Sequence, residues 1–421
     1  MQMMGARKET AGAGSQIPAT KHNSSTNLKR VLSNEKVLFI HQKNSGMALY
    51  SHEFVADLMD PQLLSGFVGA MASFLTELVG TDESGWKTVY GSESTLMVES
   101  GKWAVATLSV SKETSELRSK LRMIITEFEA TYNSISDVTR IDKEFLAGFD
   151  DFVMNVFVGD RLTMISRISR NQGWADAQIP FEQETDFLIA QRLLVEMDDG
   201  ITVEDGAKII RMPPDSVMRI VSTAYWNHAI QLDYTPMMND VLIPSEDSLS
   251  AILSQNNRLD ISHDTVNIVG YFDGRKSIQT IINELEVQNY DDVLIDLGHL
   301  IRMGYVQKTP IEQRLVLTNE RILNTLLETC KDFMSLNWIS EVVRRVLSEG
   351  VSKHPWLSRV RAFEDGTVLC LVDERLSPAN LDDMFDALQY LINETVQFFS
   401  KIIGGEKVQN ALALARKSAQ T

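Results

Sequence analysis

The chain has 421 residues, 44% hydrophobic and 23% charged, which is enough for about three domains with apolar cores. Its 40 basic and 57 acidic residues give a net charge of −17, which argues against a general nucleic-acid coat and against binding to an anionic membrane surface. It has two cysteines and no apolar run near the roughly 18 residues that cross a bilayer, so we expect a cytosolic protein without a disulfide framework.

Residues 1–33 have the composition of a tail. They lack apolar periodicity, and a segment of low hydrophobicity cannot offset the entropy lost on ordering. We therefore expect a disordered end, and the alternative is a weak contact with an acidic partner. The alternative rests on five basic residues, Arg7, Lys8, Lys21, Lys29 and Arg30.

Residues 34–160 are predicted to form the first compact unit. The apolar run 37–40, the turn residues 44–46 and the run 47–50 predict a β-hairpin, because Asn and Gly accept positive φ. A helix is predicted from Pro61 to Val79, since Asp60 can cap it and proline suits its first turn. Three strands are predicted to follow, at 86–90, 94–98 and 103–110. A long helix is predicted at 111–132, and an amphipathic stretch at 145–157.

The order of these elements, together with the Ser45-Gly46 hairpin, the segment from Leu63 to Phe67 and the strand at Trp103, resembles the longin and roadblock group of small α/β domains. In detail it is similar to the longin-type domains abundant in Asgard-type archaea. The resemblance covers about 120 of the 421 residues. It implies a five-stranded antiparallel sheet that carries its helices, and a domain that forms homo- or heterodimers.

Residues 176–320 are predicted to hold two winged-helix-like modules. The first has three predicted helices: one begins at Phe187, one begins after the N-cap Thr202, and one covers 215–228. A strand at 229–234 follows them. The second has helices over 277–285 and 291–303 and a terminal hairpin made of 305–308 and 314–317. These modules are similar to winged helices found beside signalling domains in prokaryotes.

The charge of these modules argues against DNA binding. Residues 176–320 hold 10 basic and 24 acidic residues, a net charge of −14. The two candidate recognition helices carry one arginine each, Arg219 and Arg302, whereas DNA affinity needs several cationic contacts. We therefore favour protein binding or spacing over DNA recognition for both modules.

The last unit, 321–421, is predicted to be α+β. Helices are expected at 321–336, 338–348, 381–403 and 406–419, with a hairpin around Asp365-Gly366. A second, degenerate α/β sandwich is one interpretation of this order. The fold class is thus α+β multidomain, with expected parts at 1–33 (tail), 34–160 (longin-like), 176–245 and 246–320 (winged-helix-like) and 321–421 (C-terminal).

Motifs for catalysis and cofactors do not occur. The chain has no Walker A loop, no GxGxxG after a strand and no GxSxG elbow. No two histidines or cysteines have zinc-ligand spacing, and the histidines His41 and His52 are expected to be a solvated pair beside the first hairpin. Cys330 and Cys370 are expected to be buried, inert thiols. We therefore expect no catalytic residue, no cofactor and no metal.

The predicted helix 61–79 supplies the candidate binding surface. One of its faces is apolar and is expected to cover the sheet, whereas the opposite face carries small side chains where a solvated helix would carry Lys and Glu. Small side chains allow another backbone to approach, so we expect this face to pack against another chain or against later domains of this chain. Its residues are Ser65, Gly66, Gly69, Ala72, Ser73 and Thr76.

The resemblance implies a non-enzymatic scaffold or regulator of small GTPases that pairs through its longin-like domain in a trafficking or signalling complex, recruited to membranes through partners. The whole chain also resembles, loosely, the nitrogen permease regulator-like subunits of the GATOR complex. One alternative is a transcriptional regulator or sensor that uses its winged helices. Another is a GTPase-activating protein, although no arginine lies between Arg30 and Arg118 to serve as an arginine finger; Arg140 and Arg275 remain open.

Gly69→Leu is predicted to disrupt an assembly or a domain contact, because the large side chain keeps a second backbone away from this helix face. Molecular mass by light scattering, thermal stability and partner binding are the measurements. Wild-type values in all three would mean that the face is simply exposed.

Overall fold

The computed structural model describes most of the chain, with gaps. Its described residues form an α+β fold with several small antiparallel sheets. They are 34–55, 85–90, 94–136, 143–146, 148–171, 184–195, 200–245, 248–252, 259, 261–372 and 381–420. The predicted helix 61–79 and the tail 1–33 lie outside them, and none of the described helices is both long and apolar enough to cross a membrane.

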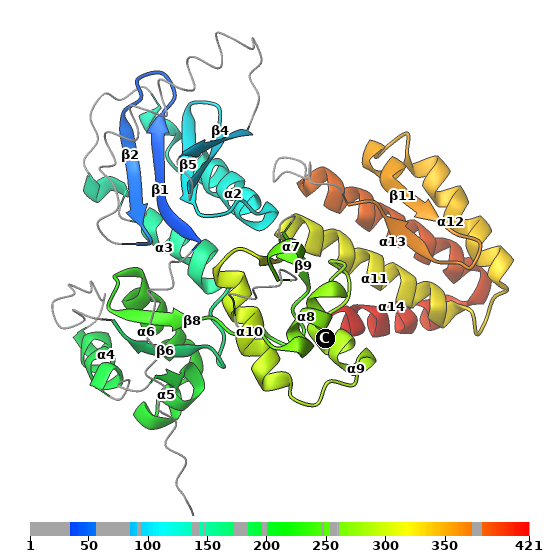
Figure 1. The fold of residues 1–421 in the computed structure, drawn as a ribbon. Helices are drawn as coiled ribbons and strands as arrows, with labels where there is room; N and C mark the ends of the chain where they lie inside the picture. Colours follow the sequence, from blue (N-terminus) through cyan, green and yellow to red (C-terminus); the bar gives the residue numbers. More distant parts are fainter. Residues whose placement is uncertain are drawn as a thin grey trace, which may run out of the picture. The chain divides into compact units, whose positions relative to one another are not determined.

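The largest sheet lies at the start of the described chain (Figure 1). Its strands follow the order β2-β1-β5-β4-β3, and all neighbours are antiparallel. The predicted hairpin is present, with Ile40 opposite Tyr50 and a bulge after Ile40. The bounds are β1 Glu35–Gln42, β2 Ala48–Glu53, β3 Gly85–Tyr90, β4 Ser94–Ser100 and β5 Ala104–Val110.

Helix α2 (Ser115–Thr131) covers one face of this sheet, as its apolar stripe requires. The Thr114 side chain caps it by accepting a hydrogen bond from the Leu117 N–H. The opposite face of the sheet holds a second buried apolar cluster, Val37, Phe39, Leu96, Val98 and Val105. Both faces of the central strands are therefore buried.

The predicted stretch 145–157 is not one helix. A 3₁₀ turn, η2 (Lys143–Leu146), comes first, and α3 (Phe149–Met154) then widens into a π-helix, η3 (Asn155–Gly159). π-helical turns are rare and are found frequently at functional sites. This one directly precedes Asp160 and Arg161.

The next segment combines helices with a three-stranded sheet of order β7-β6-β8. Strand β6 was not predicted from the sequence. Thr202 caps α5 as predicted, since its side chain accepts a hydrogen bond from the Asp205 N–H. The bounds are β6 Arg167–Arg170, α4 Glu184–Val195, β7 Ile201–Thr202, α5 Val203–Ile210, α6 Pro214–Trp226 and β8 Ile230–Asp233.

The second predicted module departs from expectation at its end. Strand β10 (Val306–Lys308) pairs with the upstream strand β9 (Leu242–Pro244), and 314–317 lies inside helix α11 (Ile311–Cys330). The predicted hairpin is therefore wrong. The residues from Arg314 to Leu317 favour a strand locally, but Val316 and Leu323 continue a helical stripe into the C-terminal core. The other helices are α7 Ser248–Ile252, α8 His263–Gly270, α9 Ile278–Glu284 and α10 Tyr290–Arg302.

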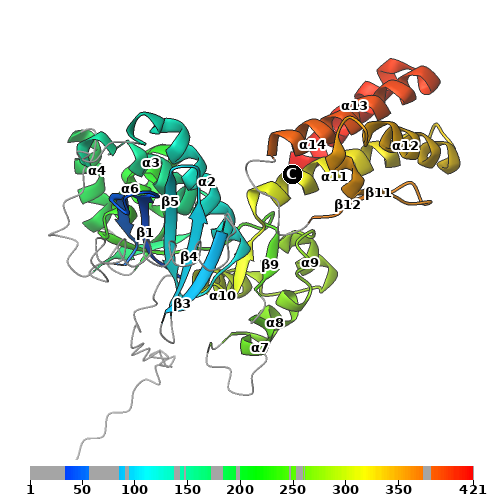
Figure 2. The same cartoon turned by 90° about the horizontal axis from the view of Figure 1, so that it is seen from above.

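The C-terminal unit is mainly helical, with α11 beside α13 and α14 (Figure 2). Its hairpin turns at Gly366, whose φ of 78° suits glycine. The predicted helices beyond 338 and the hairpin are confirmed. They are α12 Leu336–Gly350, β11 Val360–Ala362, β12 Val368–Cys370, α13 Leu381–Ile403 and α14 Gly405–Gln420, with a 3₁₀ turn, η5 (Pro355–Arg359), before β11.

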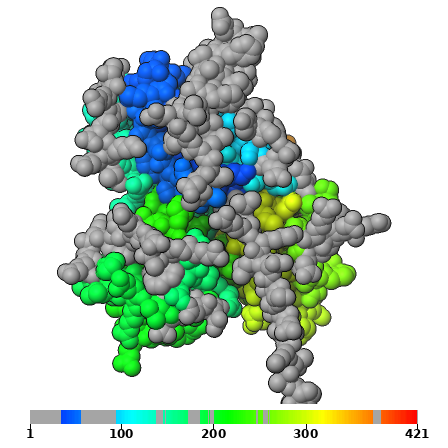
Figure 3. All heavy atoms as spheres, turned by 60° about the vertical axis from the view of Figure 1, so that its left-hand side comes forward, coloured from blue at the N-terminus to red at the C-terminus, as the bar shows by residue number. Residues whose placement is uncertain are grey.

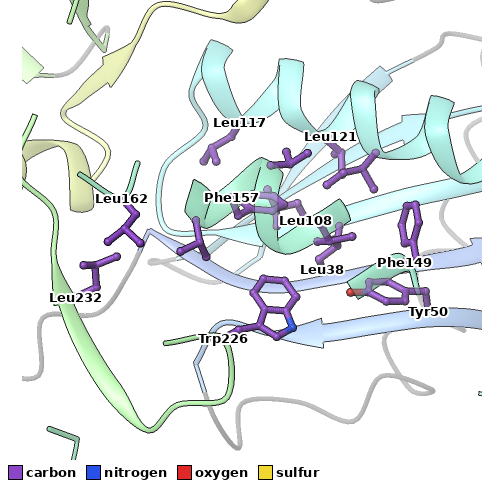
Figure 4. Close-up of a cluster of buried hydrophobic side chains, with 14 of the residues drawn as sticks. Leu38, Tyr50, Leu108, Leu117, Leu121, Phe149, Phe157, Leu162, Trp226 and Leu232 are labelled. Atoms are coloured by element: carbon purple, nitrogen blue, oxygen red, sulfur yellow. The ribbon is translucent and has the colours of Figure 1, made fainter. Parts of the chain in front are cut away.

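The first buried cluster does not stop at the predicted boundary near residue 160. It joins Leu38 and Leu121 of the sheet unit to Leu232 of β8, and Trp226 packs at the same junction (Figure 4). The blue residues of 34–55 and the green residues around 200–230 meet in the space-filling view (Figure 3). Two other clusters gather residues 234–306 and 316–415. The predicted domain boundaries stay predictions, and the described residues between 34 and 232 share one core.

Gly298 of α10 allows a close backbone contact. A Cβ atom there would lie 1.8 Å from the carbonyl oxygen of Tyr234, so α10 packs directly on the chain that follows β8. Gly298→Ala is predicted to lower the free energy of unfolding by about 3 kcal/mol, since backbone must shift. Urea denaturation is the measurement.

The matched control for Gly298→Ala is Gly270→Ala in α8. Its added Cβ would meet nothing within 4 Å, so stability should rise by about 0.5–1 kcal/mol or stay unchanged. Equal effects of the two substitutions would contradict the contact.

Candidate functional site

The six residues of the predicted binding face, Ser65, Gly66, Gly69, Ala72, Ser73 and Thr76, lie outside the described residues. The described part of the chain instead brings charged groups together at a junction that sequence reasoning did not find. Strand β1, helix α2, the turn after the π-helix, strand β10 and helix α11 all contribute to it.

Arg161 is the centre of this junction. Its Nη1 lies 2.7 Å from Glu35 Oε1, and its Nη2 lies 3.1 Å from Glu116 Oε1. Its side chain is 14% exposed, against 3% for Glu35 and 4% for Glu116. The turn after the π-helix is thereby tied to the first strand and to the first turn of α2.

A second set of ion pairs continues from Glu116. Lys120, one helical turn further on, lies 2.7 Å from it and 3.7 Å from Asp160. Asp160 also pairs with Arg314 of α11 at 3.2 Å, and its carbonyl accepts a hydrogen bond from Lys308 Nζ at 2.9 Å. The network thus extends from the sheet unit to the start of the C-terminal helices.

Strand β10 and the start of α11 are also bound to α2 by hydrogen bonds. Gln307 Oε1 accepts from the backbone N–H of Glu116 at 2.9 Å, and the Lys308 N–H donates to Glu116 Oε2 at 3.1 Å. Ser119 donates to Glu312 at 2.6 Å. Glu116 therefore satisfies two cations and one backbone donor, as a fully buried carboxylate must.

The electrostatics keep these groups charged. Burial raises the pKa of Glu116, but Arg161 and Lys120 outweigh burial, so the pKa lies well below its usual range. Burial likewise lowers the pKa of Arg161, but Glu116 and Glu35 outweigh it and the pKa lies above its usual range. The junction therefore holds ionised pairs at neutral pH.

A small cavity of about 40 Å³ lies beside these pairs. One water needs about 10–15 Å³, and pockets for drug-sized ligands span about 300–1,000 Å³, so this cavity suits only a few heavy atoms. It is too small for a nucleotide. Three charged residues, Glu35, Arg161 and Arg302, line it together with four aromatic side chains and with aliphatic residues.

Arg302 of α10 lines the cavity, and one N–H of its guanidinium has no hydrogen-bond partner among the described residues. Its Nη1 pairs with Asp233, but its buried Nε has no hydrogen-bond partner among the described residues. A buried donor without an acceptor costs about 1–3 kcal/mol.

Aromatic rings pack beside the cavity, and two of them, Phe54 and Phe157, line it. The ring of His52 stacks on Trp226 with 3.3 Å between centroids and an angle of 7°. Phe54 lies 4.7 Å from Phe157, which belongs to the π-helix. Strand β2 of the sheet unit is thus packed against the end of α6 and against η3.

The predicted solvated histidine pair is wrong. His52 lies opposite Leu38 in the β1–β2 register, and His41 is three residues from Leu38, so the two rings point to opposite faces of the sheet. Burial lowers the pKa of His41 to about 4. Burial and the nearby His228 lower that of His52 to about 3. Both rings are therefore neutral at pH 7.

Both cysteines are free and buried. Cys330 and Cys370 are buried as predicted, and burial raises the pKa of Cys330 to about 11 and that of Cys370 further. No group of three His, Cys, Asp or Glu side chains with metal-binding geometry occurs in the part of the chain that the structure describes.

Comparison with known proteins adds no assignment, since no family model matches the chain and no curated protein matches it significantly.

One sequence signal of the junction was available. Glu116 and Lys120 are spaced by four beside the apolar stripe of Leu117, Leu121 and Ile124, so a charged pair borders a buried face. The contributions of Glu35, Arg161 and Arg302 have no such signal, because they come from elements far apart in the chain.

Arg161→Met is predicted to cost about 3–5 kcal/mol of unfolding free energy, because it leaves Glu35 and Glu116 buried without their shared cation. Adding Glu116→Gln should recover part of this loss in a double-mutant cycle. Chemical denaturation of the four proteins is the measurement.

The control for Arg161→Met is Lys208→Met, which breaks the ion pair of Lys208 with Glu204 at 2.8 Å. Both side chains are exposed, 66% for Lys208 and 50% for Glu204, so this loss should be about 0–1 kcal/mol. Similar losses at the two positions would contradict a special role for the junction.

His52→Phe is predicted to weaken the pH dependence of stability. In the unfolded chain His52 gains a proton near pH 6.5, whereas in the folded chain it gains one only near pH 3. The contribution of neutral His52 to the free energy of unfolding is therefore complete above pH 6.5 and is lost as the pH falls below 6.5. Phe keeps a ring on Trp226. Between about pH 7 and pH 5 the variant should lose about 2 kcal/mol less than wild type in urea denaturation. Equal losses would contradict the burial of a neutral His52.

Proposed function

We propose that the chain is a non-enzymatic regulator that binds protein partners through its N-terminal sheet unit and acts on a small GTPase in a trafficking or signalling complex. The observation that supports this most is the strand order β2-β1-β5-β4-β3 with α2 on one face. That order suits the longin-like arrangement expected from the sequence. The GTPase itself comes from the resemblance and not from any side chain.

The arginines favour binding over catalysis. Arg118 of α2 pairs with Glu99 at 3.0 Å, and Arg122 lies 3.4 Å from the same carboxylate. Arg275, left open as an arginine finger, pairs with Glu320 and donates to the Cys370 carbonyl at 3.1 Å. Arg118, Arg122 or Arg275 could serve as an arginine finger only by leaving these contacts, and Arg140 lies outside the described residues.

The helical modules support protein binding more than DNA binding. The arginine of each candidate recognition helix is held by a carboxylate of this chain, Arg219 by Asp186 and Arg302 by Asp233. The exposed side of α10 presents Asp291 and Asp292, which repel phosphate. DNA recognition by a winged helix remains the second candidate and is tested by the same experiment.

The test is affinity purification of the tagged full chain from a native lysate, with nuclease, in GDP and in a non-hydrolysable GTP analogue, followed by mass spectrometry. We expect enrichment of a small GTPase or of another longin or roadblock protein. Nucleotide dependence would make the role regulatory. Gly69→Leu should lose this enrichment, and Gly270→Ala should keep it.

Two results would overturn the proposal. Recovery of neither class of partner, with specific DNA retained when nuclease is omitted, would favour the transcriptional alternative. Faster GTP hydrolysis by a captured GTPase in the presence of the purified chain would replace a binding role with an activating one.

A further inference from the structure

The C-terminal unit is joined to the rest of the chain without a shared apolar core. Its buried cluster takes residues from 316–415, whereas the clusters before it take residues from 37–232 and 234–306. Among the described residues, no buried cluster has members on both sides of residue 310. Units that share only polar contacts move relative to one another by default, whereas a large apolar interface holds them in place.

The first turn of α11 is bound to the sheet unit. Ser119 of α2 donates a hydrogen bond to the Glu312 carboxylate at 2.6 Å, and Arg314 pairs with Asp160 at 3.2 Å. Ile311, the first residue of the helix, is 44% exposed, so its side chain does not add a buried apolar contact. The two polar contacts make the first turn of α11 a pivot.

Arg275 binds the C-terminal unit about two helical turns beyond this pivot. Its guanidinium pairs with Glu320 of α11, and its Nη2 donates to the Cys370 carbonyl of β12 at 3.1 Å. The Glu320 carboxylate also accepts a hydrogen bond from the Cys370 N–H at 2.6 Å. One side chain from the loop before α9 thus binds both α11 and the C-terminal hairpin. We call the contacts among Arg275, Glu320 and Cys370 the Arg275 latch.

The loop that carries Arg275 is fixed by its own turn. The Asp273 carboxylate accepts hydrogen bonds from the N–H groups of Arg275 and Lys276 at 2.8 and 2.9 Å. Gly274 supplies the positive φ of 72° in this turn. The Arg275 side chain is 35% exposed and that of Glu320 is 10% exposed, so water reaches one end of the latch. Such a partly exposed ion pair opens at a lower cost than a buried apolar interface.

Helix α11 is a lever beyond the pivot. Its 20 residues extend about 30 Å, so a tilt of about 10° at the first turn moves the far end by about 5 Å. The start of α14 lies beside that far end, because Lys407 Nζ is 4.9 Å from the ring centroid of Phe333. A label near the start of α14 therefore reports a tilt of α11.

We propose that the C-terminal unit swings as one body about the first turn of α11, and that the Arg275 latch holds it in the closed arrangement. Opening the latch frees α11 and the C-terminal hairpin together, because both are bound by the same guanidinium. This inference does not depend on the proposed function, because it rests on the contacts of α11 and not on a partner of the sheet unit.

The test measures the distance between two spin labels on the full chain by pulsed electron paramagnetic resonance. One label is placed on Ala130→Cys, an exposed position of α2, and the other on Gln409→Cys, an exposed position of α14. The native Cys330 and Cys370 are buried and do not compete for the label. We expect one dominant distance when the latch is intact.

Two variants open the latch from opposite sides. Arg275→Gln removes the guanidinium, whereas Glu320→Gln removes the carboxylate charge and keeps an oxygen that can accept from the Cys370 N–H. Each variant should raise the ratio of open to closed chains at least about tenfold, because a charge-assisted contact is lost. The open chains would appear as a second distance or as a broader distribution.

Two controls separate a swing from other effects. Arg345→Gln breaks the exposed ion pair of Arg345 with Glu349 inside α12, and it should leave the distance unchanged. A label pair inside the unit, on Asn393→Cys and Gln409→Cys, should keep its distance in every variant.

The inference fails on any of three results. An unchanged distance distribution in both latch variants would mean that the placement of the unit does not depend on Arg275. An equal change with Arg345→Gln would mean that the effect is not specific to the latch. A change in the label pair inside the unit would show local unfolding in place of a swing.

Discussion

The arrangement of the described chain depends on one buried ion pair, between Arg161 and Glu116. Two charges with almost no exposure are stable only when each finds a partner in a fixed place. That requirement fixes β1 through Glu35, fixes the α2 helix through Lys120, and fixes β10 through the Lys308 N–H. Apolar packing tolerates small shifts, whereas these contacts do not. The network therefore specifies how the segments meet, more than it adds to their stability.

The elements that the sequence predicted correctly are those whose signals are local. The Asn44–Gly46 turn, the cap at Thr202 and the long helix α13 each carry their cause within a few residues. The failures have non-local causes. Residues 314–317 favour a strand by composition, but Val316 is needed in the core of α11. Strand β6 is short, and it exists because β7 and β8 flank it.

The junction was missed for the same reason. Glu35 and Arg161 are separated by more than a hundred residues, and nothing near either of them in sequence indicates a partner. The π-helix that brings Arg161 into position is also invisible to a search for amphipathic helices, because its extra residue only changes where the following side chains point. Sequence periodicity predicts which faces are buried, but not which buried charges meet.

The shared core of the sheet unit and the first helical module has a consequence for how this protein evolves. His52 lies on Trp226, and Leu38 and Leu232 belong to one buried cluster, so the surface between these segments is interior and not a removable interface. A gene rearrangement that moved the sheet unit alone would expose Phe54 and Phe157 to water and invite aggregation. The described residues between 34 and 232 are therefore expected to be inherited as one block, whereas the C-terminal helices have a core of their own and could be exchanged only if Glu312 and Arg314 of α11 kept their contacts with Ser119 and Asp160.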